Sequence, residues 1–314
     1  MTPATENSLS KRIKQKALEL GFNICGIARS RTLEEYGPFL KAWVEEGMHD
    51  IMGYLARDID KRLNPENLFP GAKSLVVTGL SYFSENMQKE PGVPVLSRYT
   101  YGSDYHEVIS AKLERLLSWI KSVEPGTDGR IVVDNAPLAE KAWAKEAGLG
   151  WQGRHSIMIN KDIGSFFFIG VLILNAELDY DAPFKKDYCG DCRICMEECP
   201  TEAINDNHTI DARRCIANVT IERRGPIPEE LVPFLGRRIY GCDRCQEVCP
   251  WNKGIIINKT QEFAINEEIA GMSTEGWKNL SREQFSRLFQ KTAMGRVKYE
   301  KLMDNIEAAM RSDT

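Results

Sequence analysis

The chain has 314 residues, 42% of them hydrophobic, and a formal net charge of −4. This length is enough for two domains with buried cores, and the acidic total excludes a protein that binds nucleic acid through a global basic field. No apolar run approaches the ~20 residues that cross a membrane, and the polar N-terminus has no signal region, so we expect a cytoplasmic protein with reduced thiols and no membrane partner.

The first 180 residues alternate helices with strands, which predicts an α/β (α+β) sandwich. The chain is expected to begin with a helix from Leu9 to Leu20 that Gly21 ends, a buried strand over 23–28, and a helix carrying Leu33, Tyr36, Phe39, Leu40 and Trp43. A polar loop over 58–65, a strand over 74–80 and a helix with Leu113, Leu116, Leu117 and Ile120 are expected next. The last elements are a strand over 130–133, an amphipathic stretch over 137–147 and a buried strand over 166–174.

Three segments of this half carry side chains that could form a site. Residues 97–106 are rich in polar and aromatic groups, and they are either the lining of a pocket or an ordinary loop with a helix cap. Asp134 follows a strand, where an acid serves either as a site residue or as the cap of the next helix. Residues 148–156 form a glycine-rich bend whose amides could approach a ligand, although the G-x-G-x-x-G order of a dinucleotide site is absent.

Eight of the nine cysteines lie between residues 189 and 250. The first block, Cys189-x2-Cys192-x2-Cys195-x3-Cys199-Pro200, has the spacing of bacterial ferredoxins, in which the fourth thiolate binds a second cluster. The second block, Cys242-x2-Cys245-x3-Cys249-Pro250, lacks a leading cysteine, which Cys215 can supply. The crossed rule then predicts two [4Fe–4S] clusters, one held by Cys189, Cys192, Cys195 and Cys249, and the other by Cys199, Cys215, Cys242 and Cys245.

Zinc and disulfides are the alternative explanations of these cysteines. Zinc sites use separated C-x-x-C pairs, whereas three thiolates in a run with a spacing of three suit a cubane better. Disulfides require export, for which the sequence gives no signal. The ninth cysteine, Cys25, has apolar neighbours and is expected to be a packed core thiol.

Residues after the second block predict a short helical tail. Ser281 and Gln284 form a capping box for a helix with Phe285, Leu288 and Phe289 on one face, and a last helix carries Met303, Ile306 and Met310. The predicted domains are an α/β domain over 1–180, a ferredoxin-like domain over 181–255, and a tail over 256–314 that packs back on the core.

Further stretches accompany the cysteines: Asp58-x-x-Lys-Arg62-x-x-Pro65, Ser97-Arg98 with Gly102-x-Asp-Tyr-His106, Val133-Asp134-x-x-Pro-Leu-x-Glu140, Gly148-Leu-Gly-Trp-x-Gly-Arg-His155 and Gly236-Arg-Arg-x-Tyr-Gly-Cys-Asp-x-Cys245. Together they resemble the epoxyqueuosine reductase family, which carries out the last step of queuosine synthesis in tRNA. The resemblance covers most of the chain, and its specificity lies in the combination of stretches.

The resemblance implies a cobalamin in the α/β domain, beside the two clusters. Matching the family's motifs places around the corrin Arg62, Ser97, Arg98, Asp134, His155, Met158, Ile169, Ala217, Cys242 and Asp243. The base-off pattern Asp-x-His-x-x-Gly is absent, because Ile109 and Asp211 stand where glycine is needed after His106 and His208. No histidine is therefore expected to bind cobalt from below.

The implied reaction converts an epoxide to an alkene with two electrons and loss of the oxygen as water. The oxygen must be protonated as its bond to carbon opens, and Asp134 is the candidate acid; partial burial beside the corrin would help it to keep a proton. The resemblance also implies an external one-electron donor, such as a flavodoxin or a ferredoxin, and tRNA as substrate. We expect a monomer.

Longer relatives append helical repeats after the cluster domain, whereas this chain stops at Thr314. Local arginines could hold tRNA phosphates instead, or could simply be solvated: Arg213, Arg214, Arg223, Arg224, Arg237 and Arg238. The alternative functions are a cobalamin-dependent reductive dehalogenase, disfavoured by the lack of a twin-arginine signal, and a ferredoxin-type electron carrier, disfavoured by about 180 residues before the first cluster.

Overall fold

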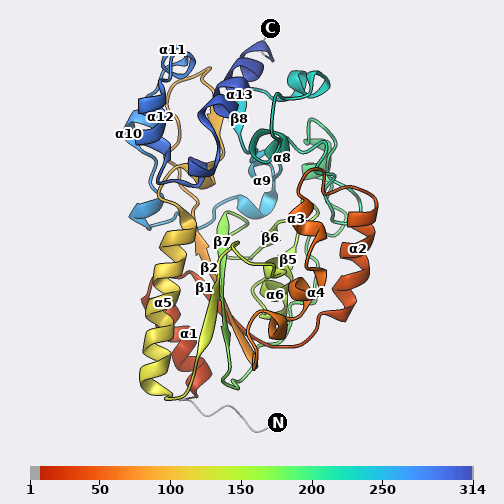
Figure 1. Cartoon of the computed structure of the whole chain (residues 1–314), viewed down its shortest axis with the longest axis vertical. Helices are drawn as coiled ribbons and strands as arrows, with labels where there is room; N and C mark the ends of the chain where they lie inside the picture. Colours follow the sequence, from red (N-terminus) through yellow and green to blue (C-terminus); the bar gives the residue numbers. More distant parts are fainter. Residues whose placement is uncertain (1–7, 313–314) are drawn as a thin grey trace.

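A sheet of four strands forms the centre of the first half of the chain in the computed structural model, which describes residues 8–312 (Figure 1). The strand order is β1-β2-β7-β4, and every neighbouring pair is antiparallel. The side chains of β2 and β7 are almost all buried, as expected for a sheet covered on both faces. The bounds are β1 (Ile24–Arg29), β2 (Ser74–Ser81), β7 (Phe167–Leu174) and β4 (Gly129–Val132).

Helices cover both faces of this sheet and make an α/β/α sandwich (Figure 1). Alternate residues of β2 point to opposite faces. Val76 and Leu80 pack in one core with α1 (Leu9–Glu19) and α5 (Tyr105–Val123). Leu75 and Val77 pack in the other core with α6 (Glu140–Glu146). The predicted sandwich is therefore confirmed.

The structure differs from the prediction in two places, one between β1 and β2 and one after β4. The expected polar loop over 58–65 contains a short helix, in which the Arg62 amide donates to the Asp58 carbonyl and the Asn64 amide donates to the Asp60 carbonyl. Phe39, which the second predicted helix carries, is 72% exposed. On the C-terminal side, α6 begins at Glu140 and not at residue 137. The elements between β1 and β2 are η1 (Glu34–Tyr36), α2 (Gly37–Glu45), α3 (Gly53–Ala56), α4 (Ile59–Leu63) and η2 (Pro65–Asn67).

The cysteine-bearing segment consists of short elements joined by turns. The parallel pairing of β3 with β8 ties it to the preceding part of the chain. In addition, Cys249 packs with Trp151 and Ile159, which lie on the paired strands β5 and β6. The elements are β3 (Val95–Leu96), η3 (Arg98–Thr100), β5 (Trp151–Gln152), β6 (Met158–Ile159), α7 (Ile194–Glu197), α8 (Ile216–Ile221), η4 (Glu229–Phe234), β8 (Arg238–Tyr240), α9 (Arg244–Glu247) and η5 (Pro250–Asn252).

The C-terminal helices share a third core with α8, η4 and β8, at the end of the molecule away from α1 (Figure 1). Asn305 is fully buried in α13, where its amide donates to the carbonyls of Thr220 (2.8 Å) and Ile239 (2.9 Å). The predicted capping box of Ser281 and Gln284 is present. The elements are η6 (Gln261–Phe263), α10 (Glu267–Ala270), α11 (Thr274–Lys278), α12 (Arg282–Phe289), η7 (Ala293–Arg296) and α13 (Tyr299–Arg311). Within residues 8–312, no helix is both long enough and apolar enough to cross a membrane.

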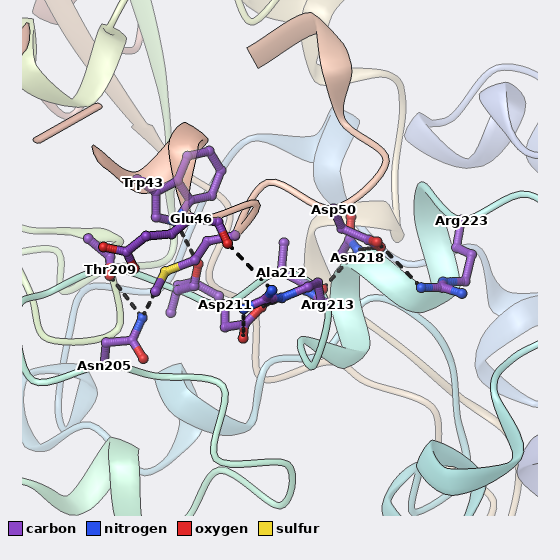
Figure 2. A network of polar contacts seen from close by, with 12 residues as sticks. Trp43, Glu46, Asp50, Asn205, Thr209, Asp211, Ala212, Arg213, Asn218 and Arg223 are labelled. Atoms are coloured by element: carbon purple, nitrogen blue, oxygen red, sulfur yellow. Dashed lines mark hydrogen bonds and ion pairs between the residues drawn. The ribbon is translucent and has the colours of Figure 1, made fainter. Parts of the chain in front are cut away.

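A polar network joins the connection between α2 and α3 to the cysteine-bearing segment (Figure 2). The Trp43 indole donates to the Ile210 carbonyl (2.8 Å), and the Ala212 amide donates to the Met48 carbonyl (2.9 Å). Asp50 accepts from the Asn218 amide (2.8 Å) and the Arg223 guanidinium (3.4 Å). Its φ of +51° is a left-handed conformation that aspartate tolerates better than most residues.

Asp50→Ala is expected to lower the free energy of unfolding by about 2 kcal/mol. The reason is that one N–H of the buried Asn218 amide and the half-buried Arg223 guanidinium lose the acceptor that Asp50 provides. Chemical denaturation of the protein with its clusters intact would measure this. Asp50→Asn keeps an acceptor oxygen and tolerates the same backbone conformation, so it should lose clearly less. Equal losses in the two variants would show that the hydrogen bonds contribute nothing.

Candidate functional site

The structure brings together the four cysteines of the first predicted cluster. Burial raises the pKa of Cys195 to about 11, and the next causes are the neighbouring thiols of Cys189, Cys249 and Cys192. Cys249 thus joins three cysteines of the other block, as the crossed rule requires. Thiols packed this closely resist deprotonation until a cation is bound, and iron supplies that charge.

The second set also lies together. The pKa of Cys245 is raised mainly by burial, and next by the neighbouring thiols of Cys242 and Cys215. Cys215 in turn lies beside Cys199. Cys195 also influences Cys245, so the two sets are neighbours. In the described part of the chain no three such side chains are arranged for a single metal ion. The assignment of each thiolate to a cluster stays a prediction, although the grouping agrees with it.

Asp134 lies two residues after the end of β4, whose last residue, Val132, pairs with Val171 of β7 in the antiparallel ladder. The φ of Asp134 is +52°, an unfavourable conformation that neighbouring contacts must stabilise. Asp134 does not cap α6, whose cap position is Ala139, so the helix-cap interpretation is wrong. Because the sheet is antiparallel, the rule for parallel sheets does not explain the placement.

Two side chains that the sequence did not single out hold Asp134. The Tyr105 hydroxyl donates to Asp134 Oδ2 (2.9 Å), and the Asp134 amide donates to Glu140 Oε1 (2.7 Å). The Tyr105 ring is stacked between His106 and Phe168, with centroids 4.0 and 4.2 Å away. Both residues occur in the motif stretches quoted above, which was the available signal.

Of the two carboxyl groups, that of Glu140 belongs to the more buried residue. Asp134 is exposed, contrary to the expected partial burial. Glu140 keeps some solvent contact, yet burial, followed by the charge of Asp134, raises its pKa to about 8. Burial, and then the charge of Asp134, also raise the pKa of Tyr105. Both neighbours of Asp134 are therefore uncharged at neutral pH.

Arg62 and Tyr54 lie close to the same aspartate. The Arg62 guanidinium donates to the Tyr54 carbonyl (2.7 Å), and its Nε is buried without a hydrogen-bond partner among the described residues. Burial, followed by the charges of Glu222 and Asp134, raises the pKa of Tyr54 to about 12. Arg62 lies close enough to Asp134 for their charges to interact, and Tyr54 of α3 joins them.

A second group of predicted residues surrounds the buried carboxylate of Asp243. The Ser97 hydroxyl donates to one oxygen of Asp243, and the Arg98 amide donates to the other (2.7 Å). Burial raises the pKa of Asp243, while these two bonds oppose the increase. A cavity of about 370 Å³ is lined by Ser97, Arg98, Cys242 and Asp243 among others. A larger groove of about 560 Å³ lies elsewhere, between the start of α1 and the end of α5.

His155 and Met158 lie on the β5–β6 hairpin and its turn. Both are buried, and burial lowers the pKa of His155 to about 4, so its imidazole is neutral. Its Nε2 has no hydrogen-bond partner within residues 8–312. Lys141 also lowers the pKa of His155 and itself lies near Asp134, which connects the hairpin with the Asp134 loop.

The glycines before this hairpin serve internal packing. A Cβ on Gly150 would lie 1.9 Å from the Ile159 carbonyl oxygen, and one on Gly148, whose φ is +76°, would lie 2.8 Å from the Ala182 carbonyl oxygen. These positions require glycine because the chain approaches itself closely. The suggested role in approaching a ligand is therefore not needed to explain them.

Ala217 and the arginines complete the predicted residues. Ala217 is half-buried on α8, two residues after Cys215, and no contact links it directly to Asp134. Among the six arginines, Arg213 pairs with Asp211 (2.8 Å), Arg214 with Glu202 (3.2 Å) and Arg223 with Asp50 (3.4 Å).

Comparison with known proteins gives consistent matches. A 4Fe-4S double cluster binding domain matches residues 188–252, and the model of epoxyqueuosine reductase QueG, DUF1730, matches residues 62–135. The epoxyqueuosine reductase of Leadbetterella byssophila is 44% identical over 297 residues, which cover 95% of this chain and 97% of that protein.

Two solved structures are similar over 97% of this chain and 81% of theirs. An epoxyqueuosine reductase with a tRNA-Tyr epoxyqueuosine-modified tRNA stem loop has a TM-score of 0.90 at 29% identity. An epoxyqueuosine reductase from Bacillus subtilis, with its Asp134 catalytic loop (that protein's numbering) swung out of the active site, has a TM-score of 0.89 at 28% identity.

Proposed function

The chain belongs to the epoxyqueuosine reductase family of oxidoreductases, and we propose that it reduces epoxyqueuosine to queuosine at the wobble position of tRNA, with Asp134 as proton donor. The observation that carries this proposal is the constrained Asp134 loop in a chain that also groups eight cysteines into two sets of four. The relative bound to a modified tRNA stem loop supports tRNA as the substrate.

The residues around Asp134 and Asp243 suit a cobalamin, a large ligand with many amide groups. The buried nitrogens His155 Nε2 and Arg62 Nε lack partners among the described residues and can bond to such groups. Half-buried Ile169 and Ala217, together with Met158, offer apolar contact. Arg62, Ser97, Arg98, Asp134, His155, Met158, Ile169, Ala217, Cys242 and Asp243 would hold the cofactor, which supplies low-potential electrons to carbon when bound.

Asp134 supplies one of the two protons that the reaction needs, and solvent supplies the other. Opening and removing the epoxide consumes two electrons and two protons and releases one water, while the carbon–carbon bond becomes double. A carboxylic acid can protonate the oxygen as its bond to carbon breaks, which avoids a poor alkoxide product. The catalytic loop of the Bacillus subtilis protein, named for an aspartate, supports this role for the Asp134 loop.

Iron–sulfur clusters accept electrons one at a time, and the positions of the two cysteine sets suggest the order in which the clusters are reduced. Cys242 lines the cavity beside Asp243 and belongs to the second set, whereas the first set lies beside the exposed residues Gly190, Asp191 and Arg193. We infer that an external carrier, such as a flavodoxin or a ferredoxin, reduces the first cluster and that the second passes electrons onward.

An anaerobic turnover assay tests the function. Protein with reconstituted clusters is incubated with a one-electron reductant and tRNA bearing epoxyqueuosine, with and without added cobalamin, and the nucleosides are analysed by mass spectrometry. Conversion to queuosine that depends on cobalamin is the expected result. Binding of the corrin without any conversion would contradict the proposed substrate.

A further inference from the structure

The loop from Val133 to Ala139 is fixed by a small number of hydrogen bonds. Asp134 is bound at both ends, by the Tyr105 hydroxyl at its carboxylate and by the Glu140 carboxyl at its amide. The Val133 amide donates to the Asn135 side chain (3.2 Å), and the Ala139 amide donates to the Arg62 carbonyl (3.0 Å). Of these, only the contact with Glu140 acts on the backbone of Asp134 itself.

That contact matters because the backbone of Asp134 is in an unfavourable conformation. A left-handed φ at a residue other than glycine persists only where the surroundings stabilise it. The acceptor for the Asp134 amide comes from Glu140, the first residue of α6, whose helix has no side-chain cap. Without Glu140, the amide has no acceptor among the described contacts, and the loop can relax to an extended conformation.

We propose that Glu140 is a positioning residue, whose carboxyl group holds the Asp134 loop in the conformation in which Asp134 acts as the acid. This inference rests on the proposed role of Asp134 and adds the residue that sets its position. Tyr105 supports the same conformation from the side-chain end, on a ring fixed by Phe168.

The charges around Glu140 explain why a neutral carboxyl suits this role. It faces the carboxylate of Asp134, the ammonium of Lys141 and the guanidinium of Arg62. With its pKa raised to about 8, the group is mainly protonated at pH 7, so it accepts the Asp134 amide without adding a negative charge beside the acid. Glutamine has the same shape and the same carbonyl acceptor, so Glu140→Gln should preserve the contact.

Hydrogen–deuterium exchange of the cluster-loaded protein, without tRNA, tests the proposal. Glu140→Ala should make the amides of residues 133–139 exchange roughly tenfold faster, because one hydrogen bond is lost. Glu140→Gln should exchange like the wild type. In turnover assays, Glu140→Ala should lower kcat and leave KM for tRNA unchanged, and Glu140→Gln should restore most of kcat.

Glu146→Ala is the matched control, because Glu146 is the last residue of the same helix, whereas Glu140 is the first. Its carboxylate pairs with Arg31 (2.9 Å) and not with the loop. Its loop should exchange like the wild type. Unchanged loop exchange in Glu140→Ala, or equal acceleration in Glu146→Ala, would overturn the proposal. Because exchange is read without substrate, this result does not depend on the reductase activity, which Asp134→Asn examines separately.

Discussion

Asp134→Asn is expected to lower turnover of epoxyqueuosine at least a hundredfold, within the range of about 10²–10⁴ that a positioned general acid contributes. Asparagine fits the left-handed backbone, accepts from the Tyr105 hydroxyl and keeps the amide that bonds to Glu140. The variant thus removes the transferable proton and almost nothing else. Single-turnover kinetics with prereduced protein would measure the step directly.

Tyr105→Phe separates the acid from its support. It deletes one hydrogen bond to Asp134 but keeps the stacking on Phe168, so its turnover should fall much less than that of Asp134→Asn. Both variants should retain their iron and their affinity for the corrin. Near-normal turnover of Asp134→Asn would reject Asp134 as the acid, whatever the result for Tyr105→Phe.

The sequence predicted those features of the site that depend on local spacing. Cysteines three and four residues apart have few ways to bind a cubane, so the spacing within each block predicted the type of cluster. The strand before Asp134 was likewise visible as a short β-rich run. In both cases neighbours along the chain determine the local geometry, and the sequence contains those neighbours.

Contacts between distant residues were not predictable from local patterns. Tyr105 reaches Asp134 only because α5 packs on the sheet next to β7. Ser97 and Asp243 meet because β3 pairs with β8, and neither strand is long enough to give a periodic signal. The antiparallel order of the sheet depends on pairing across the whole domain, which alternating helices and strands do not specify.

The short polar helix α4 was not predicted either. Residues 59–63 include the charged Asp60, Lys61 and Arg62, a composition typical of a loop. The helix nevertheless forms, and its last residue, Leu63, is buried against the sandwich. Tertiary packing decided this element, because a single turn has little stability of its own. The same turn presents Arg62 to Asp134, so the missed helix is part of the site.

Cys215→Ala is expected to reduce the iron content from about eight atoms per chain to about four, because the second cubane loses one of its four thiolates. Cys215 stands outside both cysteine blocks, so its assignment is the most critical test of the crossed scheme. Iron and sulfide analysis of the anaerobically purified protein, together with the electron paramagnetic resonance of the reduced form, would show which cluster remains.

Cys25→Ala is the matched control. Cys25 lies on β1, and burial raises the pKa of its thiol to about 12, as expected for a packed core residue and not for a ligand. It should keep about eight iron atoms, because all eight proposed ligands remain. Cys189→Ala should lose the other cluster and leave a different spectrum from that of Cys215→Ala. Full iron retention in Cys215→Ala would overturn the crossed scheme, since the cluster would then be held without the only cysteine that lies between the two blocks.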